Sequence, residues 1–89
     1  MENPKILVVD DESDMQIYLS TVVETMGFEP IVAGNGVEAL EKARAFHPAL
    51  MILDVMMPKI EDGLRAYQQF REDERLGRMP IILVSAIAR

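Results

Sequence analysis

The chain has no cysteine, no long apolar run and fewer basic than acidic residues. The absence of cysteine excludes a disulfide framework and any thiolate metal site. Every apolar run is far shorter than the ~20 residues of a membrane helix. No secretory leader precedes the first of these runs, so we expect a cytoplasmic protein without a membrane anchor. Nine basic against fifteen acidic residues give a net charge of −6, which argues against binding of nucleic acid or an anionic membrane by this segment.

Short apolar segments alternate with segments of helical periodicity. The apolar segments span residues 5–9, 28–33, 49–53 and 81–84. Alternation of this kind, with short connections, predicts one α/β domain over residues 1–89, with a parallel sheet and helices on both faces. Pro30 near the start of the second strand favours an edge position for that strand.

Spacings of three and four residues predict which side of each helix is buried. The residues expected to face inward are Met15, Tyr18, Leu19, Val22, Val23 and Met26 in the first helix, Val37, Leu40, Ala43 and Phe46 in the second, and Leu64, Tyr67 and Phe70 in the third. Ser13 is expected to cap the first helix, with Gln16 as its capping-box partner. His47 is expected to end the second helix because it precedes Pro48. The charged run 72–75 is expected to be a solvated face.

Acidic or hydroxyl side chains follow three of the four predicted strands. Asp10 and Asp11 follow the first strand, Asp54 the third and Ser85 the fourth. Because the carboxyl ends of parallel strands lie at one edge of a sheet, we expect these side chains to share a cleft. For any one aspartate, helix capping or a solvated turn would be the simpler explanation. The coincidence of all three favours a functional site.

Three carboxylates in one cleft repel one another and favour a bound cation. Ligands that are all oxygen, with room for water, favour Mg²⁺, and such a site commonly serves phosphate chemistry. Asp10 and Asp11 would hold the metal. Asp54 is then a candidate nucleophile that forms an acyl phosphate, and Ser85 is a candidate hydrogen-bond donor to a phosphoryl oxygen.

Four motifs together resemble those of the receiver domains of bacterial two-component response regulators. They are Val8-Val9-Asp10-Asp11-Glu12, Leu53-Asp54-Val55-Met56-Met57-Pro58, Asp62-Gly63 and Pro80-Ile81-Ile82-Leu83-Val84-Ser85-Ala86. The resemblance covers nearly the whole chain. It implies a flavodoxin-like, doubly wound parallel sheet whose strands have the order 2-1-3-4-5. The fifth strand and the last two helices of that fold are missing from these residues, which leaves the order 2-1-3-4 and a C-terminally incomplete receiver domain.

The resemblance implies a signalling module rather than a stand-alone enzyme, although receivers promote their own phosphorylation and dephosphorylation. Asp54 would accept a phosphoryl group from a sensor histidine kinase or a phosphotransfer protein, and the domain would then switch conformation. Ser85 would contact the phosphoryl group. The implied ligands of Mg²⁺ are Asp10, Asp11, Asp54 and the backbone carbonyl of Met56.

Two features differ from the family pattern. Three residues, 59–61, separate the proline from the Asp-Gly pair, where receivers usually have two. The lysine that bridges to the phosphoryl group in the family is absent, and none of Lys5, Lys42 and Lys59 stands in its place. Without a fifth strand, the fourth strand is an open apolar edge, so we expect either a fragment or a homodimer formed by strand pairing or swapping.

Two other functions remain open from the sequence. A Mg²⁺-dependent aspartyl phosphohydrolase normally has a second aspartate two residues after the nucleophile, and Met56 occupies that position. A pseudo-receiver that makes protein contacts without phosphorylation is disfavoured by the complete acidic set but is compatible with the missing lysine.

Overall fold

Four parallel strands form one sheet in the order β2-β1-β3-β4, in a computed structural model that describes residues 3–55 and 60–84. The strands are β1 (Lys5–Val9), β2 (Glu29–Ala33), β3 (Leu50–Asp54) and β4 (Ile81–Val84), and the helices are α1 (Ser13–Thr25), α2 (Gly36–Phe46) and α3 (Ile60–Glu72). The predicted α/β class and strand order are confirmed, and each strand begins and ends within one residue of its predicted bounds. Pro30 lies in an edge strand, as predicted.

The register brings the carboxyl ends of all four strands to one level. Val9 at the end of β1 is paired with Ala33 of β2 and with Leu53 of β3. Leu53 is paired in turn with Leu83 of β4. Residues that follow these positions in the chain therefore lie along one edge of the sheet.

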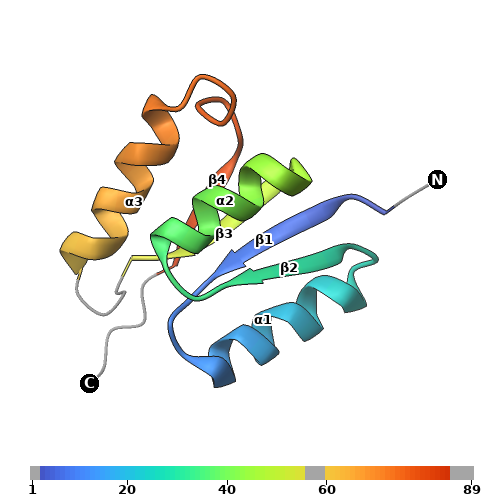
Figure 1. The fold of residues 1–89 in the computed structure, drawn as a ribbon. Helices are drawn as coiled ribbons and strands as arrows, with labels where there is room; N and C mark the ends of the chain where they lie inside the picture. The colour runs from blue at the N-terminus through green and yellow to red at the C-terminus, as the bar shows by residue number, and fades with distance from the viewer. Residues whose placement is uncertain (1–2, 56–59, 85–89) are drawn as a thin grey trace.

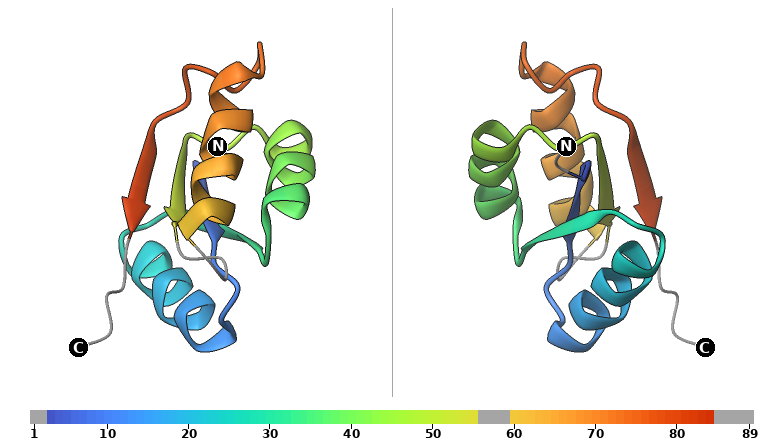
Figure 2. Two further views of the ribbon diagram at one scale, coloured as in Figure 1. Left: turned by 90° about the vertical axis from the view of Figure 1, so that its left-hand side faces the viewer. Right: turned by 90° about the vertical axis from the view of Figure 1, so that its right-hand side faces the viewer.

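The two faces of the sheet are covered unequally. Helices α2 and α3 lie together on one face and α1 lies alone on the other (Figures 1 and 2). The cluster under α2 and α3 contains Leu7, Val9, Ala33, Ala39, Ala43, Met51, Leu53, Ala66, Phe70, Leu76 and Met79. In the described ranges, the cluster under α1 has three buried residues, Ile6, Val8 and Val23. We call these the closed face and the open face.

The predicted inward side of α1 is only partly correct. Val23 is buried, but Tyr18 is 63% exposed and Met26 is 67% exposed. Helix α1 contacts β1 and β2 and does not cover β3 or β4 within the described chain. A cleft of about 400 Å³ therefore opens on this face, lined by Ile6, Val22, Val23, Met26, Phe28, Ala49, Leu50, Ile52 and Ile82.

The inward side of α2 is built from small residues rather than from its largest apolar ones. Ala39 and Ala43 are buried, whereas Val37 is 70% exposed and Phe46 is 46% exposed, so the prediction for these last two was wrong. The reason is close packing of α2 on α3. A methyl group added at Gly36 would lie 3.1 Å from Cβ of Ala66, which is closer than an ordinary contact, so the two helices leave little space at this position.

Helix α3 follows its predicted pattern with one exception. Phe70 is buried and Tyr67 is partly buried, but Leu64 is 45% exposed. Ala66 occupies the buried position instead, facing α2. No helix in the described ranges is long and apolar enough to cross a membrane.

The helix ends confirm one prediction and contradict another. His47 ends α2 in the left-handed conformation, with φ 51°, and its amide donates to the carbonyl of Ala43 over 3.0 Å. The capping box at α1 does not form. Glu12, not Ser13, occupies the cap position, and its side chain makes no cap hydrogen bond. The Gln16 side chain donates instead to the carbonyl of Asp10.

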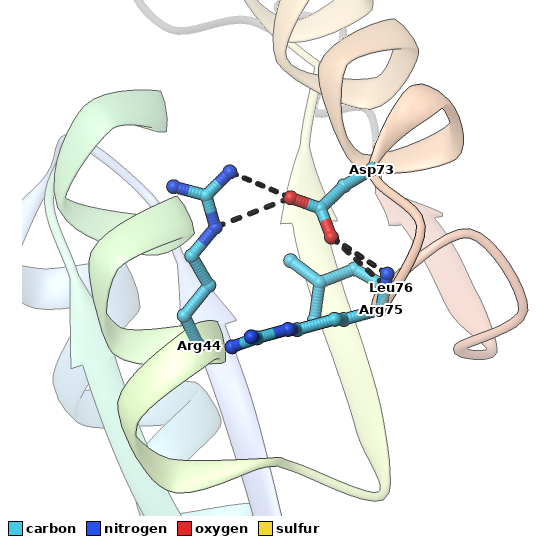
Figure 3. A network of polar contacts seen from close by, with 4 residues as sticks. All are labelled: Arg44, Asp73, Arg75 and Leu76. Carbon is cyan, nitrogen blue, oxygen red and sulfur yellow. Dashed lines mark hydrogen bonds and ion pairs between the residues drawn. The ribbon is translucent and has the colours of Figure 1, made fainter.

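The charged run 72–75 was predicted to be a solvated face, but its Asp73 side chain is bonded to the rest of the protein. Two nitrogens of Arg44 in α2 donate to one carboxylate oxygen of Asp73, over 2.7 and 3.1 Å. The other oxygen accepts from the amides of Arg75 and Leu76 (Figure 3). The hydrogen bonds from Arg44 hold the pKa of the Asp73 carboxyl below its usual value. This interaction joins α2 to the turn between α3 and β4, in which Leu76 is buried.

Candidate functional site

Three aspartates meet at the carboxyl edge of the sheet, as predicted. Asp10 directly follows β1 and Asp54 ends the neighbouring strand β3, so the register that pairs Val9 with Leu53 brings them side by side. Asp11 is the next residue along the chain. One carboxylate oxygen from each aspartate lies within 4.8 Å of the others. No other group of three or more acidic or histidine side chains in the described ranges is placed to hold a metal ion.

Asp10 is buried and its position is fixed by three hydrogen bonds. It is only 4% exposed, and its amide donates to the carbonyl of Ala33 in β2 over 3.1 Å. Its Oδ1 accepts from the amide of Glu12 over 2.9 Å, and its backbone carbonyl accepts from Nε2 of Gln16 over 2.6 Å. One carboxylate oxygen thus orders the start of α1. The other makes no hydrogen bond to the described part of the chain and is available to a ligand.

Asp11 differs from its neighbour. Its side chain is exposed and makes no hydrogen bond or ion pair with the residues that the structure describes. An exposed carboxylate beside a buried one gives the site a mouth open to solvent. A hydrated cation could therefore enter and keep some of its water, as Mg²⁺ usually does in proteins.

The charge of the cluster favours a cation. Two unit charges about 5 Å apart repel by roughly 3 kcal/mol at an effective dielectric of about 20. No lysine or arginine side chain forms a hydrogen bond or ion pair with Asp10 or Asp11 in the described ranges. The donor set is entirely carboxylate oxygen, which suits Mg²⁺ or Ca²⁺ better than a transition metal. The residues present fit a divalent cation.

Two predicted site residues lie outside the described ranges. Ser85 follows Val84, whose carbonyl accepts from the amide of Val55 over 3.0 Å at the end of β3. Met56 follows Val55. The roles assigned to the Ser85 hydroxyl and to the Met56 carbonyl therefore stay predictions.

The position of Gly63 explains why an Asp-Gly pair follows β3, the strand that ends at Asp54. A Cβ at this position would collide with the backbone of Val55, the residue directly after Asp54. Only glycine lets α3 approach that closely. The first turn of α3 is thereby packed against the chain that leaves the site.

The sequence did not reveal two side chains that order the loops around the cluster. Gln16, which was assigned to a helix cap, holds the Asp10 carbonyl. Glu38 accepts from the amide of Gly34 over 2.6 Å and so orders the loop after β2. Both are polar residues in the first turns of helices, where solvation or capping is the ordinary expectation. Nothing in the local pattern distinguishes them.

Comparison with known proteins identifies the family. The family model described as the response regulator receiver domain matches residues 6–89. The chain belongs to the response regulator receiver family. This agrees with the α/β sheet, its strand order and the acidic residues at its carboxyl edge.

Individual relatives agree with this assignment. The chain is 42% identical over 84 residues to the alkaline phosphatase synthesis transcriptional regulatory protein PhoP of Bacillus subtilis, covering 94% of this chain and 34% of the relative. It is 34% identical over 88 residues to the polar-differentiation response regulator DivK of Brucella abortus, covering 99% of this chain and 70% of the relative. The chain spans about a third of the length of the first curated relatives it matches.

Solved receiver structures share the fold. The N-terminal domain of a response regulator receiver protein from Methanoculleus marisnigri superposes with a TM-score of 0.87 at 33% identity, covering 96% of this chain and 68% of that one. The chemotaxis protein CheY4 of Vibrio cholerae gives 0.87 at 28% identity, covering 98% and 72%. Receiver domains are signalling modules that interact with histidine kinases or phosphotransfer proteins, and this chain has the fold of one.

Proposed function

We propose that this receiver is a phosphoacceptor module of a two-component phosphorelay, in which Asp54 accepts a phosphoryl group from a sensor histidine kinase or a phosphotransfer protein. The observation that carries the proposal is the approach of three carboxylates to within 4.8 Å of one another at the ends of adjacent strands. Family membership supports it independently. Residues 1–89 would form a single receiver domain that contains the first four strands of the family fold.

The proposed division of roles follows from the position of each side chain. Asp10 and Asp11, with Asp54 and the backbone carbonyl of Met56, would hold Mg²⁺. When bound, Mg²⁺ neutralises negative charge on the phosphoryl oxygens during transfer. The hydroxyl of Ser85 would donate a hydrogen bond to one of those oxygens. Asp10 is the least exposed of the three aspartates, and its contact with the Glu12 amide would link the site to α1.

The transfer itself needs little from the protein beyond placement. A carboxylate oxygen of Asp54 bonds to phosphorus as the bond between phosphorus and the donor nitrogen breaks, and the nitrogen keeps the electron pair. The product is an aspartyl phosphate, and the negative charge at Asp54 increases. That change in charge and size, at the end of a central strand, would bias the conformation of the domain.

Phosphorylation by a small donor tests the proposal. Incubation of the whole chain with acetyl phosphate and Mg²⁺ should give a mass increase of one phosphoryl group, and the adduct should be lost in alkaline hydroxylamine. Asp54→Asn should abolish the adduct, whereas Asp14→Asn, an exposed acid in the first turn of α1, should retain it. A wild-type chain that binds Mg²⁺ but forms no adduct would contradict the proposal.

The same material separates the two alternatives. Steady turnover of a generic phosphate ester, lost in Asp54→Asn, would favour an aspartyl phosphohydrolase. Failure to bind Mg²⁺ in a calorimetric titration would favour a pseudo-receiver that makes only protein contacts.

We also propose that the protein is cytoplasmic and that this acidic segment does not itself bind nucleic acid. A further proposal is that two copies associate through β4. In the described sheet β4 is an edge strand, and its Ile82 and Leu83 are 51% and 46% exposed. An apolar strand edge is a template for pairing with another chain. Light scattering at several concentrations should show a dimer that Ile82→Lys converts to a monomer; a wild-type monomer at every concentration would contradict this.

A further inference from the structure

We infer that Gln16 is a positioning residue for the divalent-cation site, acting through the peptide group that joins Asp10 to Asp11. The inference rests on the proposed Mg²⁺ site and adds a residue that neither its position nor its type marks as functional. Gln16 lies in the first turns of α1, is partly buried, and directs its side chain back toward the end of β1 rather than into solvent.

The contact is made to the backbone that carries the site. Nε2 of Gln16 donates to the carbonyl oxygen of Asp10 over 2.6 Å. That oxygen belongs to the peptide group between Asp10 and Asp11, so the hydrogen bond fixes the orientation of this peptide plane. The amide of Asp10 is already tied to the Ala33 carbonyl. With both of its peptide groups held, the direction in which the chain leaves Asp10 is determined.

Asp11 depends on this arrangement more than Asp10 does. The Asp10 carboxylate is buried and bonded to the Glu12 amide, so its position has support of its own. The Asp11 side chain is exposed and makes no hydrogen bond within the described ranges. The direction of the Asp11 carboxylate is therefore set by the two peptide groups that flank Asp11: Gln16 holds the one before it, and Oδ1 of Asp10 holds the one after it through the Glu12 amide. Loss of the Gln16 hydrogen bond would let the preceding peptide rotate and move Asp11 away from its partners.

Gln16 is neutral, so substitutions can separate the loss of its hydrogen bond from a change in charge. Gln16→Met keeps the length of the side chain and removes the donor. Gln16→Glu also removes the donor but adds a negative charge beside the cation site. If Gln16 acts by positioning, both variants weaken Mg²⁺ binding. If it acts only through the local field, Gln16→Glu strengthens binding.

The control lies on the same helix. Oγ1 of Thr21 donates to the carbonyl of Ile17 over 2.8 Å, which is also a side-chain hydrogen bond to backbone, but this one has no connection to Asp10. Thr21→Ala should leave Mg²⁺ affinity within about twofold of wild type, as expected for an independent site. Gln16→Met should weaken it by roughly tenfold, the usual scale for losing a residue that supports metal ligands.

Affinity is measured by calorimetric titration of the whole chain with MgCl₂, with far-ultraviolet circular dichroism to confirm folding and the Mg²⁺-induced rise in Tm as a second readout. If Gln16→Met does not fold, Gln16→Asn, whose amide is one methylene too short to reach, replaces it with the same expected loss. Wild-type binding with unchanged affinity in the Gln16 variants overturns this inference alone. The same holds if Tm falls with no change in affinity, or if Gln16→Glu binds more tightly. No Mg²⁺ binding by wild type overturns the proposed function and this inference together.

Discussion

The two faces of the sheet are made from similar apolar residues but are completed to different degrees. On the closed face, α2 and α3 bury Leu7, Met51 and Phe70 to 1% exposure or less. On the open face, α1 covers only the β1 and β2 side, and Ile82 of β4 remains 51% exposed. Both faces of a central strand need cover in a parallel sheet. The difference shows that burial here depends on how many helices reach a face, and only secondarily on how apolar the residues are.

The comparison also shows where periodicity misleads. Val22 and Met26 have the correct spacing for an inward-facing stripe, yet they line an open cleft. On the closed face, the small residues Ala39 and Ala43 are buried, while the larger apolar residues Val37 and Phe46 are exposed. Where α2 packs on α3, at Gly36 and Ala66, the helices approach so closely that even an added methyl group would be crowded.

The largest effect should come from truncation on the closed face. Phe70→Ala should lower the free energy of unfolding by about 3–5 kcal/mol, a large part of the roughly 5–15 kcal/mol typical of a domain. The reason is the cavity left in a cluster that has no room to relax. Urea denaturation followed by circular dichroism measures the change.

Leu64→Ala is the matched control for that prediction, because Leu64 lies on the same helix and is 45% exposed. It should cost less than about 1 kcal/mol. Equal losses for the two variants would contradict the assignment of α3 to a closed face.

A smaller effect should come from the ion pair that joins α2 to the turn after α3, at the rim of the closed face. The pKa of Asp73 is lowered in the folded state, so its contribution to stability is present above the unfolded pKa of about 3.9. That contribution is lost as pH falls through the lower, folded pKa. Asp73→Asn should therefore have a Tm a few degrees below wild type from pH 7 to pH 5.

The two melting temperatures should converge as the pH falls below the unfolded pKa of about 3.9 and through the lower pKa of the folded Asp73 carboxyl, because Asp73 of the wild type is then neutral as well. Thermal denaturation across this range checks the pattern. A constant difference in Tm down to pH 2.5 would show that Asp73 acts through the turn geometry rather than through its charge.

The smallest effect should come from the open face. Met26→Gln should change the stability of the isolated chain by less than about 0.5 kcal/mol, since Met26 is 67% exposed. Thermal denaturation at low protein concentration measures the change. A loss comparable to that of Phe70→Ala would mean that the open face is covered in solution, and the distinction between the faces would not hold there.

Much of the fold could be predicted because it depends on local signals. Four short apolar runs, Pro30 in an edge strand and His47 before a proline all took the predicted structure. The site could be predicted in part for the same reason, since Asp10, Asp11 and Asp54 directly follow or end strands whose direction is shared. The roles of Ser85 and Met56 stay predictions.

What could not be predicted depends on contacts between distant segments. The Arg44–Asp73 pair joins residues 29 positions apart, and no local pattern indicates it. Gln16 has the spacing of a capping box, but its side chain donates to the backbone carbonyl of Asp10 instead. The position of the Asp10 carbonyl decides which of these contacts the Gln16 side chain makes. That position depends on the hydrogen bond from the Asp10 amide to the Ala33 carbonyl of β2.

The sequence alone determined the class of fold, the order of its elements and the three carboxylates at one edge, because strand direction and alternation follow from local pattern and chain connectivity. The tertiary structure decided which apolar residues are buried, which helix face is built from alanine and glycine, and which side chain supports the acidic cluster. These depend on distances between elements, and such distances are set by packing after the elements have formed.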